Sequence, residues 1–202
     1  MRKIILFILL LLLPALISAQ IPGDSLSFVK SRYSSKSLSS TFEKQLKTFN
    51  LREQLILGHQ IDDFFIGFNQ TFFSTIIKSN GLSIRDNAFF SILGEYDIFT
   101  NTAVGTNINY YVYSDDKQLA INNSSISNSS GYIKFHPIEK ISFTPFVGIS
   151  KNEQIGITDI GSLYGIEALL NNLNFNEFNL FSELKFQNED ISPRKNQIIS
   201  LK

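Results

Sequence analysis

The sequence predicts an all-β fold, an antiparallel meander of long amphipathic strands. Three observations lead to this prediction. Apolar and polar residues alternate with a period of two, most alternating runs are about ten residues long, and polar connections separate them. Strands of soluble proteins have more often about five or six residues, whereas about ten are needed to cross a bilayer at a tilt.

The composition excludes several classes of function. The chain of 202 residues has no cysteine, which excludes a disulfide scaffold, a thiolate metal site and a lipid anchor on cysteine. Lys+Arg and Asp+Glu both number 18, so the basic excess of a general nucleic-acid binder is absent. With 43% hydrophobic residues, the chain can bury a core or face a membrane.

The first residues have the pattern of a secretory signal peptide. The start is basic, the run Ile4–Leu13 is apolar, and Ala19 supplies a small residue for cleavage. We therefore expect residues 1–19 to be a signal peptide and the protein to be exported. Removal of Arg2 and Lys3 leaves the mature chain with a net charge of about −2.

Residues 20–50 are expected to form a Ser-rich arm or linker. Within this arm, Ser40–Glu43 matches a capping box, in which Ser caps a helix and Glu follows three residues later. Phe42, Leu46 and Phe49 lie at helical spacing. The arm is therefore predicted to contain a short helix.

The β region is expected to span residues 51–202. The run 175–187 alternates most clearly, because Leu184 and Phe186 share one face while Glu183 and Lys185 share the other. Further runs are predicted over residues 87–98, 102–113, 126–136, 140–150 and 163–170, and less regular ones over residues 51–58 and 64–78. Pro145 falls inside one run, where it needs a sheet edge or a bulge.

The predicted connections fall into two classes that alternate along the chain. Short connections are expected at residues 98–101, 137–140 and 171–174. Longer polar connections are expected at residues 79–86, 114–125 and 151–162. Outer-membrane barrels have tight turns at the periplasmic end and longer loops outside.

The signal peptide and the alternating segments, from about Leu51 to Asp190, resemble a bacterial outer-membrane β-barrel protein. The resemblance implies strands that pair around a closed ring, because only full pairing lets a sheet tolerate lipid. It also implies outer-membrane lipid as the partner. The sequence itself predicts no nucleic-acid partner, because its charge is balanced, and no cofactor. No segment matches the functional motif of a named family, so the resemblance assigns no site residues.

Two features depart from a complete barrel. Such barrels typically end on an aromatic residue, whereas this chain ends on Lys202 after an expected loop at 188–194 and the start of a strand at 197–201. Counting from Leu51 gives eight strands with the short turns outside, and counting from Phe64 gives seven. We therefore expect the N-terminal part of a larger barrel, whose remaining strands come from the same chain or another subunit.

Few residues are candidates for catalysis or metal binding. His59 is expected at a turn and His136 at a strand end, and neither belongs to a recognisable triad. Asp62–Asp63 and Asp115–Asp116 carry oxygen ligands that suit Ca²⁺, but they lack the spacing of a calcium loop and are expected to be solvated. The sequence therefore predicts no catalytic residue, no metal site and no enzyme.

The polar strand faces are the more informative candidates. If the apolar faces meet lipid, eight residues face the lumen, where they line water in a wide barrel or form a polar core in a narrow one. In an ordinary sheet they would form a solvated face. These residues are Glu95, Asn107, Asn109, Lys134, Glu167, Glu177, Glu183 and Lys185.

Two functions remain open from the sequence. The first is an outer-membrane β-barrel protein of structural, channel or transport type without catalytic activity. The second is a secreted or periplasmic β-sandwich that binds a ligand and packs its apolar faces as a core. Long strands and alternating connection lengths favour the first.

Overall fold

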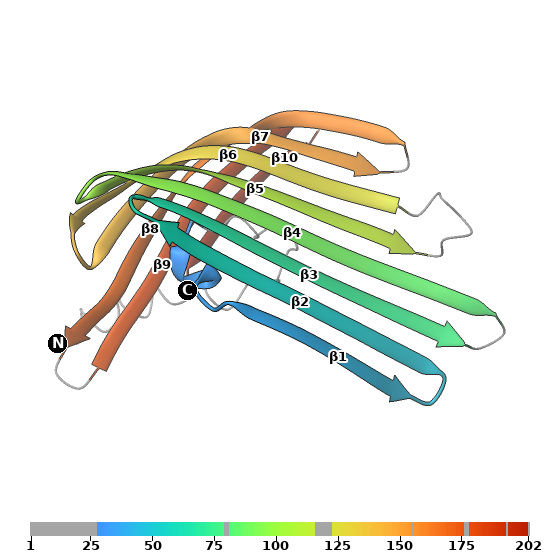
Figure 1. Ribbon diagram of the computed structural model, residues 1–202. Helices are drawn as coiled ribbons and strands as arrows, with labels where there is room; N and C mark the ends of the chain where they lie inside the picture. Colours follow the sequence, from blue (N-terminus) through green and yellow to red (C-terminus); the bar gives the residue numbers. More distant parts are fainter. Residues whose placement is uncertain are drawn as a thin grey trace, which may run out of the picture.

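A computed structural model describes residues 28–78, 81–115, 123–154, 156–175, 178–192 and 194–201. The predicted signal peptide, Asp116 and Glu177 lie outside these residues. The described residues form a 10-stranded antiparallel sheet in which each strand pairs with its neighbours in sequence (Figure 1). The predicted all-β meander is confirmed, with β1 and β10 at the two edges of the sheet.

The strands are longer than the sequence predicts, since β2 to β9 have 14 to 19 residues. A 3-10 helix, η2 (Lys30–Tyr33), precedes the sheet, and the described residues contain no helix long and apolar enough to span a membrane. The strands are β1 (Ser37–Gln45), β2 (Thr48–Ile61), β3 (Phe64–Lys78), β4 (Leu82–Phe99), β5 (Thr102–Asp115), β6 (Asn123–Ile138), β7 (Ile141–Gln154), β8 (Ile157–Phe175), β9 (Phe178–Ile191) and β10 (Arg194–Leu201).

A strand occupies the residues for which the capping box predicts a helix. β1 runs through Ser40–Glu43, and it pairs with β2 so that Phe42 lies opposite Leu51. Pairing satisfies the backbone groups of β1 along one edge, whereas a short helix would leave the ladder of β2 open. The predicted helix is therefore wrong, and the sheet begins at Ser37 rather than at residue 51.

Strands also extend into residues predicted as long connections. β4 begins at Leu82, and only residues 155–156 separate β7 from β8. The polar residues at these strand ends stay in the ladder, as Lys151 does opposite Ile160. A paired strand no longer needs alternating apolar residues once it extends beyond an apolar surface, so polarity alone misidentified these ends as loops.

Near the C-terminus the predictions were mixed. The short turn predicted at 171–174 is part of β8, and most of the loop predicted at 188–194 belongs to β9. The strand start predicted at 197–201 is confirmed as β10. Turns at 100–101 and 139–140 fall within the short connections predicted there.

Pro145 lies inside the sheet rather than at an edge. On one side it pairs with Ile166 of β8. On the other side no pair joins β6 and β7 between Tyr132↔Phe146 and Phe135↔Phe143. Because proline has no N–H, the ladder is interrupted next to it.

The two faces of the sheet have different surroundings. We call the face that contacts residues 28–33 the inner face; there the ring centroid of Phe28 lies 4.7 Å from that of Tyr132 and 5.0 Å from that of Phe146. The sheet curls around η2, so this face is concave (Figure 1). The opposite, outer face carries exposed apolar side chains on successive strands, among them Leu57, Ile66, Ile92, Ile108, Ile133, Val147, Ile166 and Leu184.

We call the end of the sheet next to η2 the η2 end and the opposite end the far end. At the η2 end β2, β4, β6 and β8 end and β3, β5, β7 and β9 begin, whereas at the far end β1, β3, β5, β7 and β9 end and β2, β4, β6, β8 and β10 begin. Asp62, between β2 and β3, has a φ of 50°, and Gly156, next to the start of β8, has a φ of 75°. Asp and Gly tolerate this left-handed conformation, which tight hairpin turns require.

Candidate functional site

Most residues predicted to face a lumen are buried on the inner face. None of the seven that the structure describes is more than 7% exposed: Glu95, Asn107, Asn109, Lys134, Glu167, Glu183 and Lys185. They come from β4, β5, β6, β8 and β9. The eighth, Glu177, lies outside the described residues. The polar face of this sheet is therefore packed where these seven residues lie.

Residues 28–33 lie against this polar face and hydrogen-bond to it. Lys134 Nζ on β6 donates to the carbonyl oxygen of Phe28 at 2.6 Å. The hydroxyl of Tyr33 and Oγ of Ser91 on β4 are 2.7 Å apart and form a buried hydrogen bond. The segment thus bridges two strands that do not pair with each other.

Glu95 is the centre of a buried ionic cluster. Its Oε2 accepts hydrogen bonds from the Tyr132 hydroxyl, at 2.7 Å, and from Lys134 Nζ. Its Oε1 lies 3.0 Å from Lys30 Nζ, which also donates to both carboxylate oxygens of Asp97, at 3.1 and 3.0 Å. Two ammonium groups therefore compensate a carboxylate that would otherwise be costly to bury.

Two groups of η2 have shifted pKa values. Partial burial opposes the charge of Lys30, but hydrogen bonds to Asp97 and Glu95 outweigh it and hold the Lys30 pKa above its ordinary value. Burial raises the pKa of Tyr33, although its hydrogen bond to Ser91 works in the opposite direction. Near neutral pH, Lys30 is charged and Tyr33 is neutral, as their contacts require.

A second group of charges lies on β8 and β9. Glu167 is directly opposite Lys185, and Glu183 lies on the same face as Lys185. The Arg32 guanidinium reaches this group from η2, 3.5 Å from the Glu183 carboxylate. Residues 28–33 therefore connect both ionic groups, one on β4 and β6 and the other on β8 and β9.

Glycines on the inner face leave the space that Tyr33 occupies. A Cβ at Gly58 would lie 2.1 Å from the Tyr33 carbonyl oxygen, and a Cβ at Gly67 would lie 2.5 Å from the Tyr33 ring. The two glycines are directly opposite each other on β2 and β3. Any larger residue would displace the segment, so the sheet is shaped to receive it.

Sequence reasoning missed the contribution of residues 28–33, which it assigned to a linker. One signal was available: Gly58 and Gly67 fall on the polar faces of two consecutive predicted strands. Facing glycines open a gap that another side chain must fill. The identity of the filling segment could not be read from this pattern.

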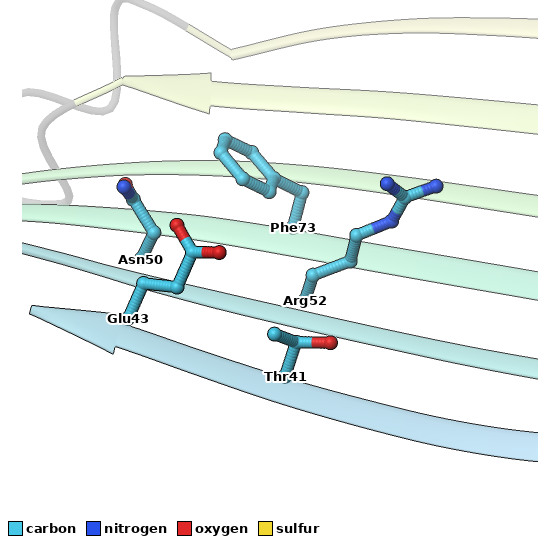
Figure 2. A pocket seen from close by; sticks show the side chains of 5 residues that line it. All are labelled: Thr41, Glu43, Asn50, Arg52 and Phe73. Atoms are coloured by element: carbon cyan, nitrogen blue, oxygen red, sulfur yellow. The ribbon is translucent and has the colours of Figure 1, made fainter.

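The far end of the inner face has an open pocket of about 310 Å³ (Figure 2). Its lining residues are Thr41, Glu43, Asn50, Arg52 and Phe73. Arg52 lies opposite both Thr41 and Phe73 on the neighbouring strands. Glu43 and Arg52 are exposed, and among the described residues neither forms an ion pair.

The remaining candidates do not converge on a site. His59 is exposed on the outer face of β2, whereas His136 is half-buried on the inner face of β6. Asp62 and Asp63 form the turn between β2 and β3. In the part of the chain that the structure describes, no three or more His, Asp or Glu side chains are arranged to hold a metal ion.

Comparisons with protein-family models, curated proteins and solved structures gave no significant match to this chain. The function of the chain is therefore inferred from its own geometry. That geometry consists of an exposed apolar face, a buried polar face and a segment that joins the two ionic groups of the polar face.

Proposed function

We propose that this chain forms the wall, or part of the wall, of an outer-membrane β-barrel of structural, channel or transport type, without catalytic activity. The polarity of the sheet carries the proposal: large apolar side chains are exposed on the outer face while Glu95, Lys185 and Gln187 are buried on the inner face. In water the hydrophobic effect favours the reverse arrangement. Lipid against the outer face accounts for it.

The strand lengths support the same proposal. About 9–11 residues suffice for a tilted strand to cross a bilayer, and β2 to β9 exceed this length. Aromatic residues also lie on the outer face, among them Phe90, stacked on Tyr110 at 6.5 Å, and Tyr96 and Phe135 nearer the η2 end. Membrane barrels carry aromatic residues on the side that faces lipid, at the two interfaces.

The inner face indicates how such a wall would be filled. Residues 28–33 occupy the concave side near the η2 end, where charged side chains are buried and paired. The far end keeps an open pocket. We therefore propose an interior that is occluded at the η2 end and open to solvent at the far end of β1 to β3.

The alternative, a secreted or periplasmic β-sandwich, would bury the apolar strand faces against a second sheet. The described residues form one sheet. Many of the buried side chains of that sheet are polar or charged. The exposed outer face therefore favours the membrane wall over the sandwich.

Cell fractionation tests the proposal. We expect the exported chain in the outer-membrane fraction, and we expect its migration on a gel to change after boiling in detergent, because closed barrels resist unfolding by detergent without heat. Recovery in the soluble periplasm, with no change of migration on boiling, would contradict the membrane wall and support the sandwich.

A further inference from the structure

Two lysines lie over one aromatic ring at the far end of β1 to β3, and a third lies in the adjacent turn. Lys44 Nζ lies 5.5 Å and Lys78 Nζ 5.0 Å from the ring centroid of Phe49. The Phe42 ring centroid lies 6.2 Å from that of Phe49. Lys47 is held at the same corner, since its carbonyl oxygen accepts a hydrogen bond from the Lys78 backbone N–H at 2.9 Å.

This lysine cluster faces outward. Gly58 of β2 faces Tyr33 on the inner side, and Phe49 is an odd number of residues away on the same strand, so it points to the outer face. Lys44 is directly opposite Phe49 and shares that face. The cluster therefore lies on the same face as the exposed apolar side chains, at their far-end border.

The lysine cluster has unbalanced positive charge. Lys44, Lys47 and Lys78 are exposed, and among the described residues none of them forms an ion pair. The outward acids of nearby strands, Glu53 and Asp86, lie further towards the centre of the sheet. Asp86 is also hydrogen-bonded to the Ser74 hydroxyl at 2.6 Å.

The opposite end of the outer face differs. The described turns at the η2 end carry Asp62, Asp63 and Glu139 with a single lysine, Lys140, next to Glu139. Among the described residues, the lysine cluster at the far end thus has no counterpart in the turns at the η2 end. Such an asymmetry suits a sheet whose two ends meet two different membrane surfaces.

We propose that Lys44, Lys47 and Lys78, with the rings of Phe42 and Phe49, bind the phosphate headgroup of an anionic membrane lipid. This inference rests on the proposed membrane location. Ammonium groups at a membrane surface attract lipid phosphates, while their alkyl stems and neighbouring aromatic rings contact the apolar region below. A lipid fits better than a soluble anion, because the cluster borders the apolar face and lies outside the inner pocket.

Native mass spectrometry of the full chain released from nanodiscs tests this site. Nanodiscs that contain equal amounts of phosphatidylglycerol and phosphatidylcholine offer one anionic and one zwitterionic headgroup. We expect the wild type to retain bound phosphatidylglycerol. The triple variant Lys44→Gln, Lys47→Gln, Lys78→Gln should retain at least about tenfold less of this lipid. Replacing the same three lysines by Arg keeps the charge and should keep the lipid.

The control is Lys140→Gln, which removes a lysine from the η2 end and should leave retention unchanged. Equal retention by the wild type and the triple Gln variant, with both inserted in nanodiscs, overturns the lipid site and leaves the membrane wall standing. A wild type that does not insert overturns both proposals. If added inorganic phosphate displaces the lipid, the proposal of a lipid site is wrong and the lysine cluster binds a soluble anion instead.

Discussion

Two regions of the inner face, the η2 end around Glu95 and the far end of β1 to β3, have the same residue chemistry and opposite environments. Near the η2 end, Glu95 is 2% exposed and is bound by Lys30 and Lys134. Near the far end, Glu43 and Arg52 are exposed beside an open pocket. These positions are equivalent in the alternating pattern. The period of two therefore predicts the face on which a residue lies and does not predict how far its side chain is buried.

What covers the face makes the difference. Residues 28–33 lie over the η2 end and bring two cations of their own, and the curl of the sheet brings β9 to the same segment (Figure 1). The pocket at the far end involves the edge strand β1, which is exposed along its length. The environment of Glu95 and Lys134 in this sheet therefore depends on a segment outside it.

The largest expected effect is on stability, and it is tested by removing one acidic side chain from each of the two regions. Glu95→Ala leaves Lys134 and Lys30 without the carboxylate that they share, which should lower the free energy of unfolding by about 3–5 kcal/mol. Glu43→Ala, the matched exposed acid on the same face, should change it by less than about 0.5 kcal/mol. Urea unfolding in lipid vesicles measures both.

Similar values for Glu95→Ala and Glu43→Ala would contradict the distinction between a packed and an open end. A large loss for both would mean that the far end is also packed in the membrane. A small loss for both would mean that the ionic cluster around Glu95 contributes little to stability.

The second prediction concerns the space under Tyr33. Gly67→Ala places a Cβ 2.5 Å from the Tyr33 ring and should cost about 1–3 kcal/mol of unfolding free energy. Gly81→Ala is the matched control at the far end, where no atom lies within 4 Å of the added Cβ. Its effect on urea unfolding should be within about 0.5 kcal/mol.

A double variant makes the cause of the Gly67→Ala loss measurable. In a Tyr33→Ala background the clashing ring is gone, so the added cost of Gly67→Ala should nearly disappear. Strictly additive losses would show that Gly67 matters for another reason, such as strand conformation, and that Tyr33 does not fill the space above it.

The sequence was sufficient to predict the face of the residues in the clearly alternating runs. Glu183 and Lys185 alternate with Leu184 and Phe186, and the structure keeps this division, with the first pair buried and the second exposed. A period of two is a local property of an extended chain, so it survives whatever packs against the strand. Strand ends were predicted less well, because paired polar residues such as Lys151 resemble a loop.

The packing of residues 28–33 could not be predicted from the sequence. The ion pair between Lys30 and Asp97 joins residues far apart in the chain, and its formation depends on how the sheet curls. Likewise, the capping box at Ser40 satisfied a local rule that pairing with β2 overrode. Local patterns fix faces and elements, whereas contacts across the concave side depend on the whole sheet.

The smallest expected effect at ordinary pH is the titration of the η2 contacts. The Lys30 pKa in the folded state is raised above 10.5, so its contribution to stability is fully present below that value and is lost as pH rises through the folded pKa. The pKa of Tyr33 is also raised in the folded state. Above pH 10.0, Tyr33 therefore loses its proton more readily when residues 28–33 are detached than when they are bound, which favours detachment. Both groups therefore predict release of residues 28–33 in strong alkali and none near neutral pH.

Tyrosinate absorbance measures this release, and the difference between the wild type and Tyr33→Phe isolates Tyr33. We expect Tyr33 to titrate above the usual tyrosine value of 10.0. Lys30→Arg should shift the release to higher pH, because guanidinium keeps its charge where ammonium loses it. A Tyr33 transition at or below 10.0 would mean that the segment is already detached, and the two ends of the inner face would then be equally open.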